Sequence, residues 1–310
     1  MAIKETKKND KNRHPAPQNN IQWGCIGMRW HIPQEDFGIV LDRYERYLRD
    51  CDYSENSIAS GKKLVSNFLK FAKESHPTIE QADAYREILI DRKLAPGTIN
   101  LYYFAIRNFY KMHGEEYKHI ILACHNAIPH YFSEDEVHRI FDATRNIKHL
   151  AMLQTMFYGC LRASELCDLE DRDLDIAKLS VHVRHGKGDK EGIVCITPNC
   201  ASTLRRYLSI RPTLLIDGKQ YLFYTDDGNK WNRKIFHKIF EQIKHRAKIT
   251  RPGGLHVFGR HTPATLMIAH GADIRVVQTI LRHNDIKTTL RYAHVSDTTK
   301  RTMYDKFLVI

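Results

Sequence analysis

The sequence has no uninterrupted apolar stretch of the ~18 residues that a membrane-spanning helix needs, so we expect no membrane segment. Residues 1–13 are polar and lack the apolar core of a secretory signal. Only 7 cysteines occur in 310 residues, and none forms a C-x-x-C pair, so a disulfide framework is not expected. Together these absences predict a protein of a reducing compartment, which we place in the cytoplasm, associated with the nucleoid.

Acidic residues are scarce relative to basic ones, 36 against 48, which leaves a net charge of +12. Such an excess makes a polyanion, such as double-stranded DNA, the first candidate for a partner. The 18 histidines and 7 cysteines lack finger-like spacing, so a zinc enzyme is disfavoured. A hydrophobic content of 42% supplies enough material for real cores, and the length suggests two domains.

The first part of the chain divides into a tail, a helical domain and a linker. Residues 1–33 are basic, contain prolines and show no helical period, which is typical of a solvated tail. Apolar residues at helical spacing predict four helices within residues 34–116, the third opened by a capping box at Thr78 and the fourth opened by Thr98 with Leu101 facing inward. Residues 117–131 are expected to link this domain to the next.

Residues 132–296 predict a second domain that mixes helices with a small sheet. A capping box at Ser133 opens it. Apolar residues alternate on both sides of a glycine-containing turn at 186–189, which predicts a β-hairpin. Helices then return, the last of them capped by Asp273. Residues 297–310 predict a C-terminal helix that is exchanged between protomers or packs on its own domain.

Several side chains of this domain suit phosphodiester chemistry without a metal. Arginine binds the non-bridging phosphate oxygens as a fork, lysine can protonate a leaving oxygen, and histidine can bind phosphate or move a proton. Tyrosine is a nucleophile that leaves a covalent protein–phosphate link. The candidates, in chain order, are Arg162, Lys187, His256, Arg260, His283 and Tyr292.

The order of these residues resembles that of the tyrosine recombinases, the phage integrase family. Residues 159–166 are similar to the family's G-L-R-x-S-E-L segment, and residues 186–190 to its G-K-G-x-K hairpin. Residues 260–265 resemble R-H-T-F-A-T, and residues 281–292 resemble L-G-H-x-x-x-x-T-T-x-x-Y with the same spacing from histidine to tyrosine. The resemblance covers roughly residues 35–300.

The resemblance implies a mainly α fold: a four-helix, SAM-like core-binding domain and an α+β catalytic domain with a small β-hairpin sheet. It implies a site-specific DNA recombinase that works as a homotetramer on two duplexes, without metal, ATP or other cofactor. Tyr292 would form a 3′-phosphotyrosine, for integration or excision of a mobile element or for replicon resolution. Arg162 and Arg260 would clamp the phosphate, Lys187 would protonate the leaving oxygen, and His256 and His283 would assist. Glu165 would orient Arg162.

Three positions depart from the family pattern. Three residues rather than two separate His256 from Arg260, and Pro263 is typical of the first position of a helix. The sequence therefore predicts that His256 and Arg260 precede a regular helix, in a turn. Arg282 stands where the family has glycine, and Gly192 where its hairpin often has arginine.

Two other function classes stay open at this point. A catalytically weakened or inactive DNA-binding protein on the same scaffold would bind specific sites without forming a covalent adduct, and the spacing between His256 and Arg260 is its support. A type IB topoisomerase shares the tyrosine chemistry, but the length and the integrase-like spacing disfavour it.

Overall fold

The computed structural model describes residues 36–124, 129–184, 191–293, 301 and 304–306. The chain divides into two compact units between Cys124 and His125. The predicted tail at 1–33 lies outside the described residues, as does most of the predicted C-terminal helix at 297–310. The boundaries proposed for tail, linker and C-terminal helix stay predictions.

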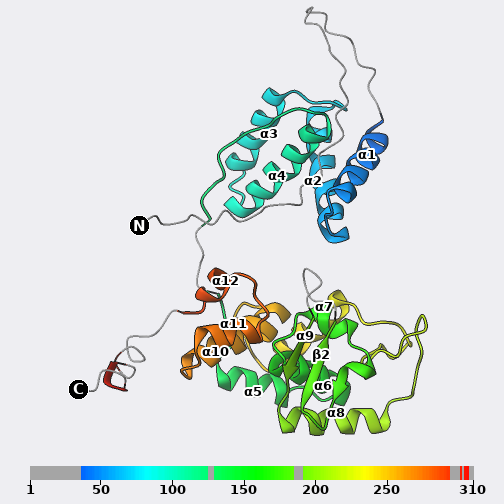
Figure 1. Ribbon diagram of the computed structural model, residues 1–310, viewed down its shortest axis with the longest axis vertical. Helices are drawn as coiled ribbons and strands as arrows, with labels where there is room; N and C mark the ends of the chain where they lie inside the picture. The colour runs from blue at the N-terminus through cyan, green and yellow to red at the C-terminus, as the bar shows by residue number, and fades with distance from the viewer. Residues whose placement is uncertain (1–35, 125–128, 185–190, 294–300, 302–303, 307–310) are drawn as a thin grey trace, which may run out of the picture. The chain divides into compact units, whose positions relative to one another are not determined.

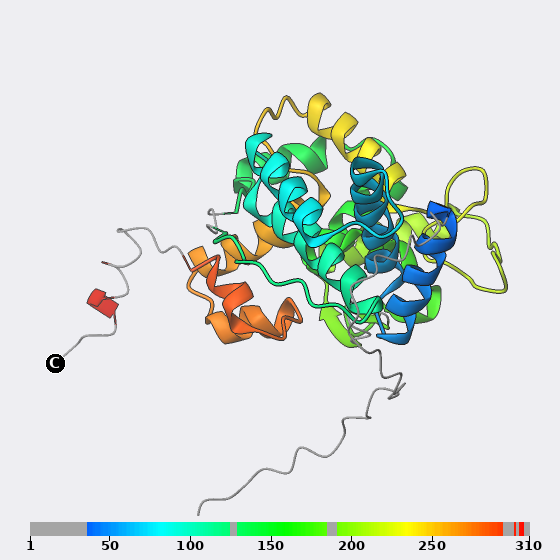
Figure 2. The same cartoon turned by 90° about the horizontal axis from the view of Figure 1, so that it is seen from above.

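The described part of the first unit, residues 36–124, is built from four helices, seen from above in Figure 2. They are α1 (Phe37–Asp50), α2 (Glu55–Ala72), α3 (Ile79–Asp91) and α4 (Pro96–Met112). The predicted capping box is confirmed, because Thr78 and Gln81 bond to each other's backbone N–H groups. The fourth helix begins two residues before Thr98, since Pro96 occupies its first turn, where a missing N–H costs nothing.

The core of the first unit forms where α2 and α4 pack together. Phe68 and Phe109 are fully buried there, with their rings edge to face at 6.4 Å. The prediction that Leu101 faces inward is wrong, because its side chain is 57% exposed while Ile99 and Tyr103 on either side are buried. The segment after α4 stays on this unit, since Asn100 bonds the backbone of Leu122 in both directions.

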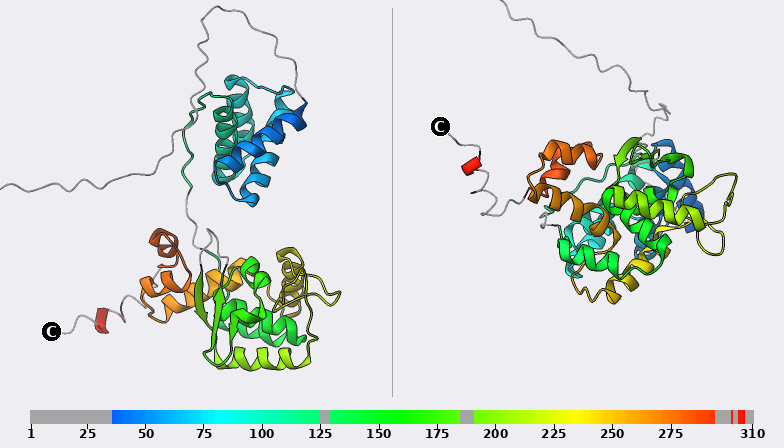
Figure 3. Two further views of the ribbon diagram at one scale, coloured as in Figure 1. Left: turned by 45° about the vertical axis from the view of Figure 1, so that its right-hand side comes forward. Right: turned by 90° about the horizontal axis from the view of Figure 1, so that it is seen from below.

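The second unit combines eight α-helices and two short helical turns with a three-stranded antiparallel sheet, counted over the described residues. The first helices are α5 (Glu134–Asp142), α6 (Ile147–Tyr158) and α7 (Ala163–Asp168), followed by the 3₁₀ turn η1 (Asp171–Asp173). The predicted capping box at Ser133 is confirmed at the start of α5. Helix α8 (Pro198–Ile210) lies along α6 (Figures 1 and 3).

The predicted hairpin is confirmed as β2 (Ser180–Val183) and β3 (Gly192–Cys195), and its tip at 185–190 lies outside the described residues. A third strand, β1 (Leu174–Asp175), was not predicted because two residues are too few to show alternation. Val181, Val183 and Val194 turn their side chains into the core of the unit. The mainly α fold with a small antiparallel sheet is thereby confirmed.

The last helices of the unit are α9 (Arg233–Arg246), the π-helical turn η2 (Val257–His261), α10 (Thr262–Ala269), α11 (Ile274–Ile280) and α12 (Ile286–Leu290). Asp273 caps α11 as predicted, by accepting a bond from the N–H of Arg275. Helices α10, α11 and α12 gather at one side of the unit in every view (Figures 1 to 3). Cys160, Ala264, Val277, Leu281 and Tyr292 form a small separate core there.

The prediction that His256 and Arg260 lie in a turn before a regular helix is wrong. The helix is continuous from residue 255 to Ala269 and contains the π-helical turn η2. The N–H of Thr262 bonds the carbonyl of Val257, five residues back, so this turn holds one more residue than an α-helical turn. Pro263 follows directly and has no N–H to continue an α-helical ladder.

No helix in the described part of the chain is long and apolar enough to cross a membrane.

Replacing Gly259 by alanine tests how tightly η2 packs on α6. A methyl group there would lie 2.6 Å from both Cγ and Cε of Met156 and 3.0 Å from the carbonyl oxygen of Leu161. We expect the Gly259→Ala variant to lose about 1–3 kcal/mol of unfolding free energy, measured by urea denaturation. The same exchange at Gly97, whose nearest neighbour would lie at 3.9 Å, should cost nothing. Equal stability of the two variants would contradict this packing.

Candidate active site

Arg162 and Glu165 sit at the corner where α6 turns into α7. The chain leaves α6 through Gly159 and Cys160, and Arg162 becomes the N-cap residue of α7. The Glu165 carboxylate accepts the backbone N–H of Arg162 at 2.9 Å and its Nη1 at 2.5 Å. Since Glu165 is 3% exposed, it fixes both the backbone and the guanidinium of Arg162.

Arg282 shares the same carboxylate. Its Nη2 lies 2.6 Å from Oε2 of Glu165, and its side chain is 8% exposed. Gly192 on β3 leaves room for it, because a methyl group on Gly192 would lie 2.7 Å from Cδ of Arg282. Burial raises the pKa of Glu165, but the charge of Arg282 and the bonds from Arg162 outweigh it and leave that pKa lowered.

Arg260, on η2, is the most deeply buried charge of the site at 1% exposure. Its Nη1 donates to the carbonyl of Cys160 at 2.8 Å, and its Nη2 donates to the carbonyl of Leu281 at 2.6 Å and to Nε2 of His283 at 3.0 Å. Burial, followed by the charge of Arg162, lowers the pKa of Arg260 to about 10, so it stays charged at neutral pH. These contacts occupy three of its five N–H groups.

The two carbonyls that hold Arg260 come from strained stretches of backbone. Cys160 has φ +47°, and Arg282, directly after Leu281, has φ +54°. Side chains other than glycine rarely adopt this left-handed conformation, and each instance costs of order 1 kcal/mol. The strain turns two main-chain oxygens toward one guanidinium.

His283 lies between Arg260 and α12. Its Nε2 accepts from Arg260, and its Nδ1 lies 2.9 Å from Oγ1 of Thr289, so the proton of the neutral ring is on Nδ1. Burial and the neighbouring arginines lower the pKa of His283 to about 4. The ring is therefore neutral at pH 7 and braces Arg260.

Tyr292 follows α12 and is 6% exposed. Its hydroxyl lies 2.7 Å from Nδ1 of His261, the residue directly after Arg260. Burial raises the pKa of the phenol, although the charges of Arg260 and Arg291 oppose this effect. The phenol is therefore protonated at neutral pH and hydrogen-bonded to an imidazole.

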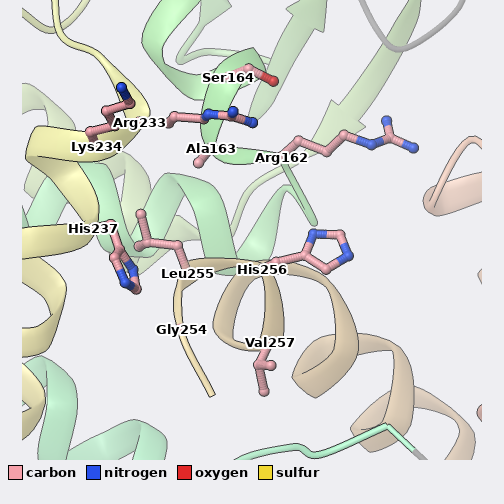
Figure 4. A pocket seen from close by; sticks show the side chains of 10 residues that line it. All are labelled: Arg162, Ala163, Ser164, Arg233, Lys234, His237, Gly254, Leu255, His256 and Val257. Carbon is pink, nitrogen blue, oxygen red and sulfur yellow. The ribbon is translucent and has the colours of Figure 1, made fainter. Parts of the chain in front are cut away.

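His256 connects this cluster to an open cavity of about 500 Å³. Its ring stands edge to face on that of His261, with the centroids 4.7 Å apart. Figure 4 shows Arg162 and His256 extending along one side of the cavity, while Lys234 and His237 project from α9 on the other. The lining is basic, which suits a polyanion.

The structure brings together most of the residues that the sequence singled out: Arg162, Glu165, His256, Arg260, His283 and Tyr292. Lys187 lies outside the described residues. Two further residues gain a role only from the structure. Nothing in the spacing of His261 shows that it contacts Tyr292. Arg282, which departs from the family's glycine, pairs with Glu165.

Residues 130–299 match the phage integrase family, which is more than half of the chain. The chain belongs to this family of tyrosine recombinases. It is thus an enzyme of DNA cleavage and rejoining, and the expected resemblance is confirmed.

Two relatives align over nearly the whole chain. The tyrosine recombinase XerD of Oceanobacillus iheyensis is 30% identical over 295 residues, which are 88% of this chain and 97% of the relative. The tyrosine recombinase XerA of Pyrococcus horikoshii is 28% identical and covers 87% of this chain and 94% of the relative.

Solved structures show the same fold. The crystal structure of a XerA recombinase is 28% identical, with a TM-score of 0.53, and the match covers 89% of this chain and 100% of that one. The Tn1549 transposon integrase, solved in complex with transposon right end DNA, has a TM-score of 0.69 at 19% identity, and the match covers 87% of this chain and 99% of that one. At 19% identity, the match to the transposon integrase shows a shared fold alone.

Replacing Glu165 by glutamine tests the shared carboxylate. We expect Glu165→Gln to lose roughly 3–5 kcal/mol of unfolding free energy at pH 7, because two arginines lose their counter-charge in a buried place. The lowered pKa of Glu165 contributes stability that is present above its unfolded pKa near ~4.3 and is lost as the pH falls through the lower folded value. Urea denaturation between pH 7 and pH 3 should show that the variant loses less unfolding free energy over this range than wild type does.

The matched control is Glu134→Gln, which removes a carboxylate that is 57% exposed and paired with His270 on the same unit. It should change stability by less than about 1 kcal/mol. A Glu165→Gln variant as stable as this control would contradict the role of the carboxylate.

Replacing Gly192 by alanine tests the room left for Arg282. We expect a loss of about 1–3 kcal/mol in the wild-type background, because the new methyl would displace Arg282 from Glu165. In an Arg282→Gly background the same exchange should cost nothing, since the clash is gone. The measurement is a double-mutant cycle of urea denaturation, and additivity within about 0.5 kcal/mol would refute the coupling.

Proposed function

We propose that this chain is a site-specific DNA recombinase that cuts and rejoins DNA through a covalent 3′-phosphotyrosine at Tyr292. One observation carries the proposal. A buried tyrosine hydroxyl is hydrogen-bonded to a neutral imidazole and lies among arginines. The described hydrogen bonds of these arginines include only one carboxylate, that of Glu165. A nucleophile beside unmatched positive charge suits a substrate that supplies an anion.

In this proposal the arginines bind the scissile phosphate. Glu165 holds Arg162 toward the cavity, and Arg260 is braced by two carbonyls and His283. Both guanidinium groups stabilise the extra negative charge of the five-coordinate phosphorus. His256 and His283 assist in phosphate binding and proton movement. Lys187, which lies between β2 and β3 in the sequence, protonates the leaving 5′ oxygen.

The phosphotyrosine keeps the energy of the broken bond, so rejoining requires no external energy source. The free 5′-hydroxyl attacks the phosphotyrosine and Tyr292 leaves. We assign no metal or ATP to this reaction. We further propose that four copies assemble on two duplexes, in the nucleoid, with the C-terminal helix reaching a neighbouring protomer.

The biological role in the proposal is integration or excision of a mobile element, or resolution of replicon dimers. The XerD and XerA relatives and the transposon integrase fold neighbour do not separate these roles, because each requires the same chemistry at the site.

The extra residue between His256 and Arg260 does not favour an inactive DNA-binding protein over this proposal. In an α-helix one added residue would rotate Arg260 by about 100° relative to His256. The π-helical turn contains one more residue per turn, so the two side chains remain on one side of the helix. The spacing by itself therefore does not argue for loss of activity.

Covalent trapping tests the proposed function. A binding site is first selected from a random duplex library with the Tyr292→Phe protein, and a duplex with a nick beside that site is then incubated with each protein. We expect a band on a denaturing gel that contains protein and DNA, formed by wild type and absent with Tyr292→Phe, because only the phenol can make the link.

The control is Tyr131→Phe, which alters an exposed tyrosine outside the site and should leave the adduct unchanged. Specific binding on a native gel without any adduct from wild type would instead favour the inactive DNA-binding protein.

A further inference from the structure

His261 is the group in direct contact with the proposed nucleophile. The 2.7 Å distance from the Tyr292 hydroxyl to Nδ1 is that of a strong hydrogen bond. Nδ1 is the acceptor when the proton of the ring is on Nε2, so the phenol donates. Of the three histidines in the cluster, His283 has both nitrogens bonded to Arg260 and Thr289, and His256 contacts the ring of His261 rather than the phenol.

We propose that His261 is the general base that takes the proton of Tyr292 when Tyr292 attacks the DNA phosphate, and returns it when the strand is rejoined. This inference rests on the proposed function and adds a catalytic residue to it. It assigns the proton to the residue that follows Arg260, not to His256.

The surroundings of His261 keep it ready to accept a proton. Arg260 and His256 face it from its own helix, His283 from the end of α11, and Arg291 with Tyr292 from the end of α12. Burial, followed by these positive and titratable neighbours, lowers the pKa of His261 to about 4. The imidazole is therefore unprotonated at every pH at which the protein would act.

An imidazole with so low a pKa is a weak base, and a bound phosphate raises that pKa. The phosphodiester brings a negative charge among Arg162, Arg260 and Arg291, which offsets the repulsion that disfavours the imidazolium ion. The pKa of His261 then rises toward the working pH, where a general base is most effective. DNA binding thus strengthens the base only when the phosphate is in place.

The step balances as follows. The Tyr292 oxygen forms a bond to phosphorus while its proton moves to Nδ1 of His261, and the bond from phosphorus to the 5′ oxygen breaks. That oxygen takes a proton from the general acid, which we assign to Lys187. In rejoining, the 5′-hydroxyl attacks phosphorus and returns its proton to Lys187, while the Tyr292 oxygen leaves and recovers its proton from His261.

The test compares wild type with His261→Asn in single-turnover adduct formation on the nicked duplex, from pH 6 to pH 9.5. Asparagine places an amide oxygen near the position of Nδ1, so the hydrogen bond is retained but the proton cannot be accepted. We expect the adduct to form at least ~100-fold more slowly at pH 7, the lower end of the usual contribution of a general base.

The pH profile separates this role from a structural one. The wild-type rate should level off once the pH exceeds the raised pKa of His261 in the DNA complex, because the base is then unprotonated. The rate of the variant should rise about tenfold per pH unit, because without a general base only the ionised fraction of Tyr292 can attack. A merely structural defect would lower the rate equally at every pH.

A duplex with sulfur in place of the leaving 5′ oxygen separates the base from the acid. A thiolate leaves without a proton, so this substrate should restore the Lys187→Ala variant but not His261→Asn. His270→Asn is the matched control, because His270 lies exposed at the end of α10 and should keep the wild-type rate and profile.

The outcomes distinguish the two proposals. A wild-type rate in His261→Asn, a loss independent of pH, or a loss restored by the sulfur substrate would each overturn the role of His261. Absence of any adduct from wild type, or an adduct that survives Tyr292→Phe, would overturn the proposed function and this inference with it.

Discussion

The site depends on a buried guanidinium whose described hydrogen bonds include none to a carboxylate. Arg260 is 1% exposed, and it is held by the carbonyls of Cys160 and Leu281 and by His283. Burying a charge against neutral dipoles is costly, and the chain adds the strain of two left-handed residues to aim those carbonyls. A fold that buries such a charge without a carboxylate bonded to it is more stable with an anion bound, and a DNA phosphate is that anion in the proposed function.

The charge of Arg260 also affects the protonation state of the histidines. Burial together with the arginines lowers the pKa values of His256, His261 and His283, so all three rings are neutral at pH 7. Neutral rings can accept protons and hydrogen bonds, which protonated rings cannot. Since a phosphate would offset the arginines, substrate binding and proton transfer are coupled through electrostatics, and no conformational change is needed to link them.

Local patterns in the sequence predicted much of this structure. The capping boxes at Thr78 and Ser133 and the N-cap at Asp273 were correct, because a cap needs only residues a few positions apart. The family motifs likewise indicated Arg162, Arg260 and Tyr292 before their geometry was known. The inward prediction for Leu101 failed, because the face that a helix buries depends on its neighbours in space.

Contacts between distant segments were beyond the reach of such patterns. The bond from Tyr292 to His261 joins residues 31 positions apart, and the pair of Arg282 with Glu165 joins residues 117 apart. Neither leaves a periodic signal. The π-helical turn was missed for a related reason: Pro263 suggests the start of a new helix, whereas the helix is continuous through η2, where Gly259 lies close to Met156.

The departures from the family pattern are best understood together with their neighbours. Arg282, taken alone, is a bulky residue at a left-handed position, and Gly192, taken alone, is a missing arginine. In space the glycine provides the room that the arginine occupies, and Glu165 offsets its charge. The added residue between His256 and Arg260 is likewise accommodated by a wider turn. Because each of the three changes is accommodated by the surrounding fold, none of them implies loss of the site's chemistry.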